Sequence, residues 1–310
     1  MWYVLGILSR WLLFSGILTA VGSLVFRGLI LPKHPLSTRS PDDPDSYDVV
    51  VGAAHFGVFA ICLLLIGSLG RLAAQFAVFR DPYASLTSEL SLLVGSTTWG
   101  QAWAWQAVFG IIALFAFIAA GNRSKKFSST LWILAGLAVF VLALTPAFSG
   151  HAYGSERWTV ALVIGDFVHV MAAGVWLGTL FVITGTVVVA KGRGGHVPKA
   201  DLIGWIASFS PLALASAAAI GVTGLLASWV HVDQISSMWT SPYGQRLSLK
   251  LAVLLIVLGF GAFHWKRAQD RVQASHGSGR LPLTVAIELV GGLAILFVTA
   301  VLVATPMPGE

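Results

Sequence analysis

Two ionisable side chains, Asp166 and His169, stand inside one of the long apolar stretches of this 310-residue chain. They are three positions apart, so in a helix both side chains lie on the same face. A charged carboxylate in hydrocarbon costs several kcal/mol unless it is neutralised, paired or hydrated. Because an imidazole at this spacing can share a proton or a cation with the carboxylate, the pair is the first candidate for chemistry. We expect both side chains to face the interior of a helix bundle.

His151 and His231 belong to polar connections that we predict on one side of the molecule, beside the start of the helix that carries Asp166 and His169. Imidazole nitrogen binds Cu(I), Cu(II) and Zn(II), and a carboxylate favours Cu(II) or Zn(II). These four residues are therefore candidate ligands of a late transition metal. At 1.5 Å per residue, His169 lies roughly 16 Å into its helix. This depth favours two successive stations, an entrance at His151 and a deeper site at Asp166 and His169.

Each of these four residues also has a structural interpretation. His151 and His231 would then be solvated residues of polar loops. Asp166 and His169 would form a hydrogen-bonded pair between helices that only fixes their packing. Both interpretations stay open at the level of the sequence.

A second group of ionisable residues is predicted near the opposite side, at similar depths in three other apolar stretches. We favour structural roles for this group, because His264 adjoins an aromatic and basic segment that anchors a helix at the interface, and because Glu288 can pair with a nearby cation. The sequence leaves open whether these residues form a second site. The group consists of His55, His264 and Glu288.

The elements that position these residues must be membrane helices. Hydrophobic residues make up 56% of the chain, charged residues only 10%, and the mean hydropathy is +0.83. Soluble domains carry about 25% charged residues, and stretches of about twenty apolar residues are long enough to cross a bilayer as helices. We predict an all-α polytopic bundle forming a single membrane domain over 1–310. About eight transmembrane helices are expected near 9–31, 49–70, 100–120, 131–149, 158–190, 202–230, 247–265 and 282–304.

The orientation follows from the basic residues. Of the nineteen Lys and Arg residues, thirteen fall on one side of this arrangement and six on the other. The side with the excess should be cytoplasmic, which places both termini on the outer, periplasmic side.

The segment 71–99 is expected at the interface, without a further crossing. The apolar stretch near the N-terminus lacks a basic region before it, which favours a first helix that is retained.

Several short motifs occur together in the C-terminal half. Their order and spacing resemble the signature of the copper-resistance protein D family, known as CopD, over roughly 145–308. The N-terminal half is similar only more loosely, between Arg10 and Arg27 and between Thr98 and Trp103. The motifs are Gly150-His151-Ala152, Asp166-Phe167-Val168-His169, Trp176-Leu177-Gly178, Phe209-Ser210-Pro211, Thr223-Gly224, Ser241-Pro242-Tyr243-Gly244 with Lys250, and Ala304-Thr305-Pro306-Met307-Pro308.

This resemblance implies an eight-helix protein of the bacterial inner membrane that moves copper between periplasm and cytoplasm. His151, Asp166 and His169 match the polar positions of the family, whereas His231 is supported by proximity alone. The resemblance also implies close packing at Trp176 and Gly178. Copper would come from a separate periplasmic chaperone or from another subunit. Only four methionines are present, which weakens a relay of thioether ligands for Cu(I).

Three hypotheses about the function follow from these observations. Copper transport is the leading hypothesis. The second is a membrane subunit that carries electrons through b-type haem, for which His169 needs a second histidine at its own depth. The third is a structural or assembly subunit of a larger membrane complex. An enzyme is not expected, because the sequence lacks a nucleophile with its base, a glycine-rich phosphate loop and an HExxH motif. The basic residues are scattered along the chain, which disfavours nucleic-acid binding. Cys62 is the single cysteine, which disfavours cysteine chemistry.

Overall fold

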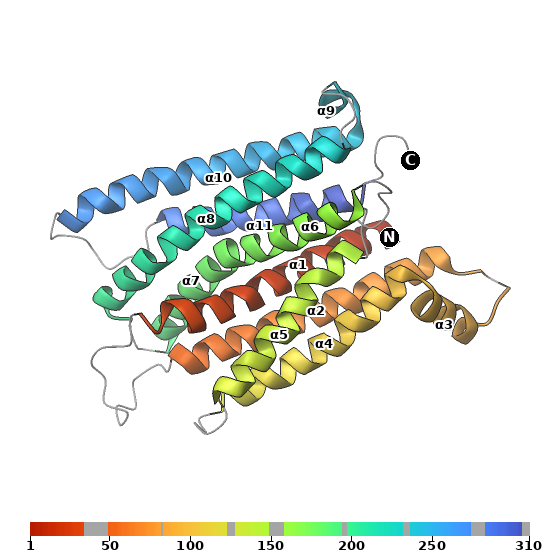
Figure 1. Ribbon diagram of the computed structural model, residues 1–310, viewed down its shortest axis with the longest axis horizontal. Helices are drawn as coiled ribbons and strands as arrows, with labels where there is room; N and C mark the ends of the chain where they lie inside the picture. Colours follow the sequence, from red (N-terminus) through yellow and green to blue (C-terminus); the bar gives the residue numbers. More distant parts are fainter. Residues whose placement is uncertain are drawn as a thin grey trace. The chain divides into compact units, whose positions relative to one another are not determined.

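The described part of the chain forms helices and short turns. Among the residues that the structure describes, none forms a strand, which confirms the predicted all-α fold class. Two compact units make up the chain, Met1–Val230 and His231–Glu310 (Figure 1). The computed structural model describes residues 1–33, 49–81, 83–122, 128–148, 158–193, 197–231, 236–273 and 283–305.

Helix α1 (Trp2–Val25) runs along α2 (Val49–Phe79) at the centre of the first unit (Figure 1). Glycines permit this contact. A Cβ on Gly16 would lie 2.5 Å from a backbone atom of α2, and a Cβ on Gly67 would lie 2.6 Å from a backbone atom of α1. Small residues let membrane helices approach until their backbones touch. The two helices therefore form a tightly packed antiparallel pair.

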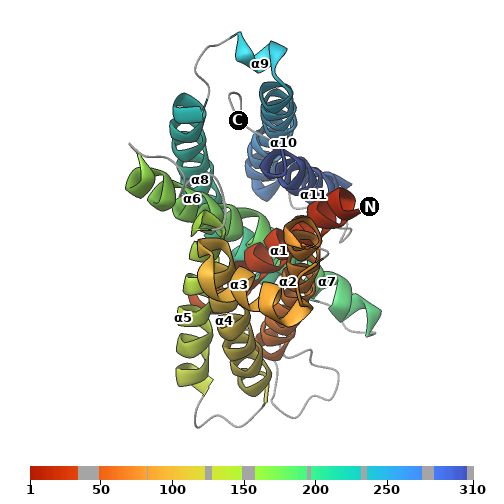
Figure 2. The same ribbon diagram turned by 90° about the vertical axis from the view of Figure 1, so that its right-hand side faces the viewer.

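Helices α4 (Thr98–Ala120) and α5 (Ser128–Phe148) pack against each other, and α4 also packs against α2. In the chain, α3 (Leu86–Ser96) follows α2 and precedes α4, and it touches both of them (Figure 2). The Ser85 hydroxyl caps α3 by accepting from the backbone N–H of residue 88. At about 1.5 Å per residue, 11 residues are too few to cross a bilayer. This part of the expected interfacial segment therefore adds no crossing.

A long helix interrupted by a π-helical segment carries the candidate residues. In the π-helical segment, Gly178 lies directly against the backbone of α1, and a Cβ there would overlap the Leu18 carbonyl oxygen. Trp176 of the same segment is buried. The close packing expected at Trp176 and Gly178 is thus present. The three parts of the helix are α6 (Thr159–Ala173), η4 (Gly174–Gly178) and α7 (Thr179–Gly192).

Helix α8 (Lys199–His231) presents one buried stripe to the first unit. Its Trp205 ring meets the Phe26 ring edge to face, with the centroids 5.1 Å apart. Phe26 begins η1 (Phe26–Ile30), the π-helical end of α1. The spacing of the stripe is helical, so the opposite face of α8 is exposed within this unit. The buried residues of the stripe are Asp201, Trp205, Phe209, Ser216 and Ile220.

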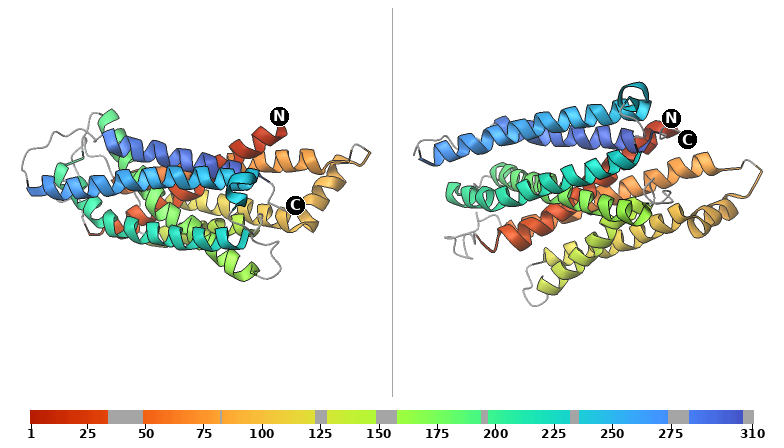
Figure 3. Two further views of the ribbon diagram at one scale, coloured as in Figure 1. Left: turned by 90° about the horizontal axis from the view of Figure 1, so that it is seen from above. Right: turned by 45° about the horizontal axis from the view of Figure 1, so that its top comes forward.

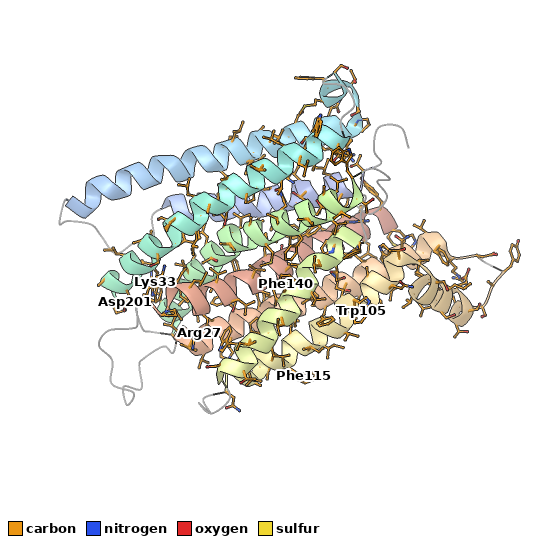
Figure 4. All side chains as sticks on the ribbon, viewed as in Figure 1. Arg27, Lys33, Trp105, Phe115, Phe140 and Asp201 are labelled. Atoms are coloured by element: carbon orange, nitrogen blue, oxygen red, sulfur yellow. The ribbon has the colours of Figure 1, made fainter. Side chains whose placement is uncertain are left out.

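Large apolar side chains cover the outside of the helices. Trp105, Phe115 and Phe140 on α4 and α5 are 60%, 65% and 47% exposed (Figure 4). Large exposed apolar surfaces are unusual for soluble proteins and are expected where lipid surrounds a helix. Among the described residues, six helices are long and apolar enough to cross a membrane, which makes this a multi-pass membrane protein. They are Trp2–Ile30, Val49–Phe79, Thr98–Ala120, Ser129–Phe148, Thr159–Gly192 and Ala200–Val230.

The second unit contains α9 (Ser237–Thr240), α10 (Pro242–Gln273) and α11 (Leu283–Val303). Helices α10 and α11 run side by side in both views of Figure 3. Arg246 near the start of α10 donates to the Thr305 hydroxyl just beyond α11. This bond joins the two helices at one end of the pair.

Helices occur at all eight predicted places, and the main difference lies at the end of α2. The prediction ends this helix at residue 70, whereas α2 continues to Phe79. The boundary was wrong because Arg71 does not end the helix: its guanidinium stacks on the Trp99 ring, 5.6 Å from the centroid. The membrane crossings of α10 and α11, the sides of the two termini and the single membrane domain stay predictions.

Candidate functional site

Asp166 and His169 lie in the regular α-helical part of α6, one turn apart. Their side chains therefore share one face of the helix, as the spacing predicts. Both are half-buried. Helix α6 is apolar apart from these two residues and Thr159 at its start, so the polar face is short. Counted along the helix from Thr159, His169 lies about 15 Å from the start.

His169 faces α8. Its Nδ1 atom lies 2.9 Å from the hydroxyl oxygen of Thr223. The Thr223 hydroxyl also lies 2.7 Å from the Ala219 carbonyl oxygen and 3.3 Å from that of Ile220. Gly224 beside Thr223 leaves room for the imidazole, because a Cβ there would lie 3.9 Å from the His169 Cε1 atom. The contact joins α6 and α8 at the level of the candidate site.

Aromatic rings flank this site. Trp158, just before α6, and Trp229, near the end of α8, have ring centroids 6.0 Å apart. Both indoles are substantially exposed, as expected for residues in the headgroup layer of a bilayer. On the other side of α6, Phe167 contacts Phe140 of α5, with the centroids 4.8 Å apart. The rings hold α6 between α5 and α8.

The remaining candidates are not joined to this pair by the structure. His151 lies outside the described residues. His231 ends α8, but its side chain lies outside the described part of the chain. In the described residues, no three His, Cys, Asp or Glu side chains form a group that could hold a metal ion. The site as described therefore consists of Asp166, His169 and Thr223.

The predicted second group is divided between the two units. His55 is exposed on α2 in the first unit. His264 and Glu288 fall within α10 and α11 of the second unit, and their side chains lie outside the described part. The structural roles that the sequence favours for these residues therefore stay predictions.

A buried network of neutral side chains lies between α2, α4 and α5 and was not predicted from the sequence. The Ser68 hydroxyl donates to Gln106 Oε1 at 3.1 Å, and Gln106 Nε2 donates to the Thr145 hydroxyl at 3.2 Å. Thr145 in turn donates to the Leu142 carbonyl oxygen at 2.8 Å. The indole of Trp103 donates to the Ser68 carbonyl oxygen at 2.9 Å. The network contains no ionisable residue, so single polar residues within apolar stretches are its signal in the sequence.

At the far end of the first unit, Arg27 of η1 stacks on the Trp132 ring of α5, 5.9 Å from the centroid (Figure 4). Trp132 also contacts Phe117 of α4 edge to face. The sequence predicts that this end is cytoplasmic. A guanidinium on an indole face is favourable, the more so away from water. Arg27 thus helps to join α1, α4 and α5 at this end.

The chain was compared with known proteins. A family model described as "Copper resistance protein D-like, N-terminal domain" matches residues 1–161, and one described as "Copper resistance protein D" matches residues 203–302. Asp166 and His169 lie between these two ranges, and Thr223 lies in the second. No solved structure matches the chain.

One relative is the copper transport protein CutJ of Bacillus subtilis (strain 168). It is 29% identical to this chain over 216 residues, which cover 69% of this chain and 38% of the relative. The match thus spans well under half of the relative's length. The N-terminal family model alone covers more than half of this chain, and the second model covers much of the remainder. The chain therefore belongs to the copper resistance protein D family.

Proposed function

We propose that this protein transports copper ions across a membrane, and that the ions pass Asp166 and His169. The observation that carries the proposal is a carboxylate and an imidazole, half-buried and one turn apart, in a helix that is otherwise almost entirely apolar. Ionisable residues at such positions mark ion pathways in membrane proteins. Membership of the copper resistance protein D family and the name of the CutJ relative support copper as the transported ion.

The chemistry of the pair suits a passing ion. Imidazole nitrogen binds both oxidation states of copper, and the carboxylate adds negative charge that favours Cu(II). A transport site must bind an ion strongly enough to replace water and weakly enough to release it. Two ligands on one turn of helix leave further coordination positions for water or for the next ligand. Such a site holds copper less tightly than a closed structural site with four protein ligands.

An entrance formed by His151 and His231 is the second part of the proposal. The contact between Trp158 and Trp229 supports it, because this contact brings the start of α6 and the end of α8 to the same end of the first unit. His231 is the last residue of α8, and His151 precedes α6 by only a few residues. Copper would be received here, from a periplasmic chaperone or a partner subunit, and passed inward.

The excess of Lys and Arg on the other side supports an orientation with this end in the periplasm, both chain termini outside and the protein in the bacterial inner membrane. Transport needs no covalent chemistry, so we assign no enzymatic activity. The full chain is then one membrane domain of about eight spans, and lipid surrounds its exposed apolar faces.

The test is copper accumulation by liposomes that contain the purified protein, measured by mass spectrometry. We expect His169→Ala to reduce accumulation to the level of protein-free liposomes. His55→Ala is the matched control, because it makes the same substitution at an exposed histidine of α2, and it should accumulate copper as the parent does. Folding of each variant is checked by its thermal unfolding in detergent.

Three results would contradict the proposal. One is a His169→Ala variant that is folded and transports as the parent does. Another is a Soret band in the optical spectrum of the purified protein, which would assign His169 to a b-type haem. The third is a folded parent that neither binds nor accumulates copper after loading, which would favour a structural subunit of a membrane complex.

A further inference from the structure

Thr223 has a defined hydrogen-bonding arrangement beside the candidate copper site. A threonine hydroxyl has one hydrogen to donate and two lone pairs that accept. Its oxygen lies 2.7 Å from the Ala219 carbonyl oxygen and 3.3 Å from the Ile220 carbonyl oxygen, and both of these groups only accept. The single hydrogen is therefore directed along α8, toward the preceding turn. This is the usual bond of a threonine within a helix.

The same oxygen lies 2.9 Å from His169 Nδ1. Since its hydrogen is used within α8, the hydroxyl meets the imidazole with a lone pair, and Nδ1 must be the donor. A neutral imidazole carries its hydrogen on one nitrogen only, so a donor at Nδ1 leaves the lone pair on Nε2. The geometry thus selects one of the two tautomers of His169.

We propose that Thr223 is a positioning residue that holds His169 in the Nδ1–H tautomer and so makes Nε2 the nitrogen that binds copper. The part that concerns copper rests on the proposed function; the part that concerns the tautomer does not. Histidine ligands of metals commonly donate their other ring N–H to an oxygen acceptor, which fixes both the tautomer and the ring orientation. The bond to the Ala219 carbonyl oxygen fixes the position of the Thr223 hydroxyl, which makes it a well-ordered acceptor.

The arrangement also gives α8 a specific part in transport. Asp166 and His169 both come from α6, so a site made of these two alone would not respond to a neighbouring helix. Through Thr223, the orientation of the imidazole depends on where α8 lies. A shift of α8 relative to α6 by a turn would remove the acceptor and release the ring.

The tautomer can be observed directly. Protein labelled with ¹⁵N in histidine and kept free of metal gives ring-nitrogen signals that differ between the two tautomers, and the loss of a signal in His169→Gln identifies this residue. We expect the Nδ1–H form in the parent and in Thr223→Ser, which keeps the hydroxyl. Thr223→Val has nearly the same shape but no acceptor, and it should give a mixture of both tautomers.

Copper affinity is measured on the same four proteins by titration with copper alone. Loss of an outer-shell partner usually weakens metal binding about 10–100-fold, so we expect this loss in Thr223→Val and near-parent affinity in Thr223→Ser. Thr299→Val serves as the matched control, because Thr299 of α11 makes the same bond within its own helix, to the Ile295 carbonyl oxygen at 2.8 Å. It should change neither the tautomer nor the affinity.

The outcomes separate this inference from the proposed function. The Nε2–H tautomer in the parent, or an unchanged tautomer in Thr223→Val, would overturn the role of Thr223 even if the protein transports copper. A Thr223-dependent Nδ1–H tautomer in a parent that binds no copper would uphold the positioning role and contradict copper transport. A shifted tautomer with unchanged affinity in Thr223→Val would refute Nε2 as the copper ligand.

Discussion

The first unit contains two polar regions inside apolar helices, and they differ in kind. The neutral network of Ser68, Gln106 and Thr145 joins α2, α4 and α5, and its side chains are 2%, 1% and 5% exposed. The pair Asp166 and His169 on α6 is ionisable and only half-buried, and it faces α8. One region is neutral and closed, and the other is ionisable and partly open.

This difference shows which role in a membrane protein each kind of polar group can fill. Neutral groups can be buried completely when each donor finds an acceptor, and they then hold helices together. A carboxylate and an imidazole are costly at the same depth unless they are neutralised, paired, hydrated or bound to an ion. We therefore expect substitutions in the neutral network to affect the stability of the fold, and substitutions in the ionisable pair to affect copper transport.

The largest expected effect is on transport. Asp166→Asn keeps the shape of the side chain and removes its charge, so copper accumulation in liposomes should fall to the background. Because asparagine has nearly the same volume as aspartate, the packing of α6 and the stability of the fold should change little. Thermal unfolding in detergent measures the second part. A variant that transports normally would remove the carboxylate from the path and weaken the contrast with the neutral network.

The next largest effect is on stability and concerns Gly178. Its Cβ in Gly178→Ala would overlap the backbone of α1; overpacking typically costs about 1–3 kcal/mol, and an overlap with backbone lies at the upper end of this range. Gly136→Ala is the control, because nothing lies within 4 Å of a Cβ at that position. Chemical unfolding should show a large loss for the first variant and none for the second. Equal stability of the two would mean that α1 and η4 are not in contact in the membrane.

A smaller loss of stability is expected for Gln106→Leu. It removes the interhelical bonds to Ser68 and Thr145, and bonds of this kind contribute about 0.6 kcal/mol each on average in membrane proteins. The loss should be about 1 kcal/mol, and copper accumulation per folded protein should be unchanged. If transport were lost while the fold remained, the neutral network would belong to the ion path, and the comparison would fail.

The smallest effect is expected for Trp229→Leu at the end of α8. The ring contact with Trp158 contributes about 0.5–1.5 kcal/mol at most, and Trp229 is largely exposed. Unfolding should shift slightly, and copper accumulation should stay within about twofold of the parent, a change of under 0.5 kcal/mol. Trp239→Leu on α9, another exposed tryptophan, is the control. If Trp229→Leu greatly reduced transport and Trp239→Leu did not, the functional region around Asp166 and His169 would include the predicted entrance.

Much of the fold could be predicted from hydrophobicity, because a helix in a bilayer must be apolar along its length. The Asp166 and His169 pair could be found for the same reason, since charge at that depth is costly. The sequence showed only a loose family resemblance in the N-terminal half, because no short motif marks it. The family model nevertheless matches all of residues 1–161.

Other features depend on which helices face each other, and a single sequence does not contain this information. Thr223 stood in a recognised motif, yet a hydroxyl carries no charge, and its contact with His169 spans 54 positions of the chain. Gln106 was not predicted either, because its amide side chain also carries no charge. The burial of Arg71, which is 8% exposed within α2, was not predicted either, because the ring of Trp99 that lies against it belongs to another helix.

The contact of Gly178 with Leu18 also has a mechanical consequence. Main-chain atoms of α1 and η4 touch at this crossing, so the crossing can act as a pivot around which the helix that carries η4 turns. His169 lies nine residues from Gly178, a lever arm of about 13 Å. A turn of about 10° would therefore displace the imidazole by about 2 Å, which is enough to break a hydrogen bond. A small rotation in the middle of the helix would thus open and close the proposed copper site.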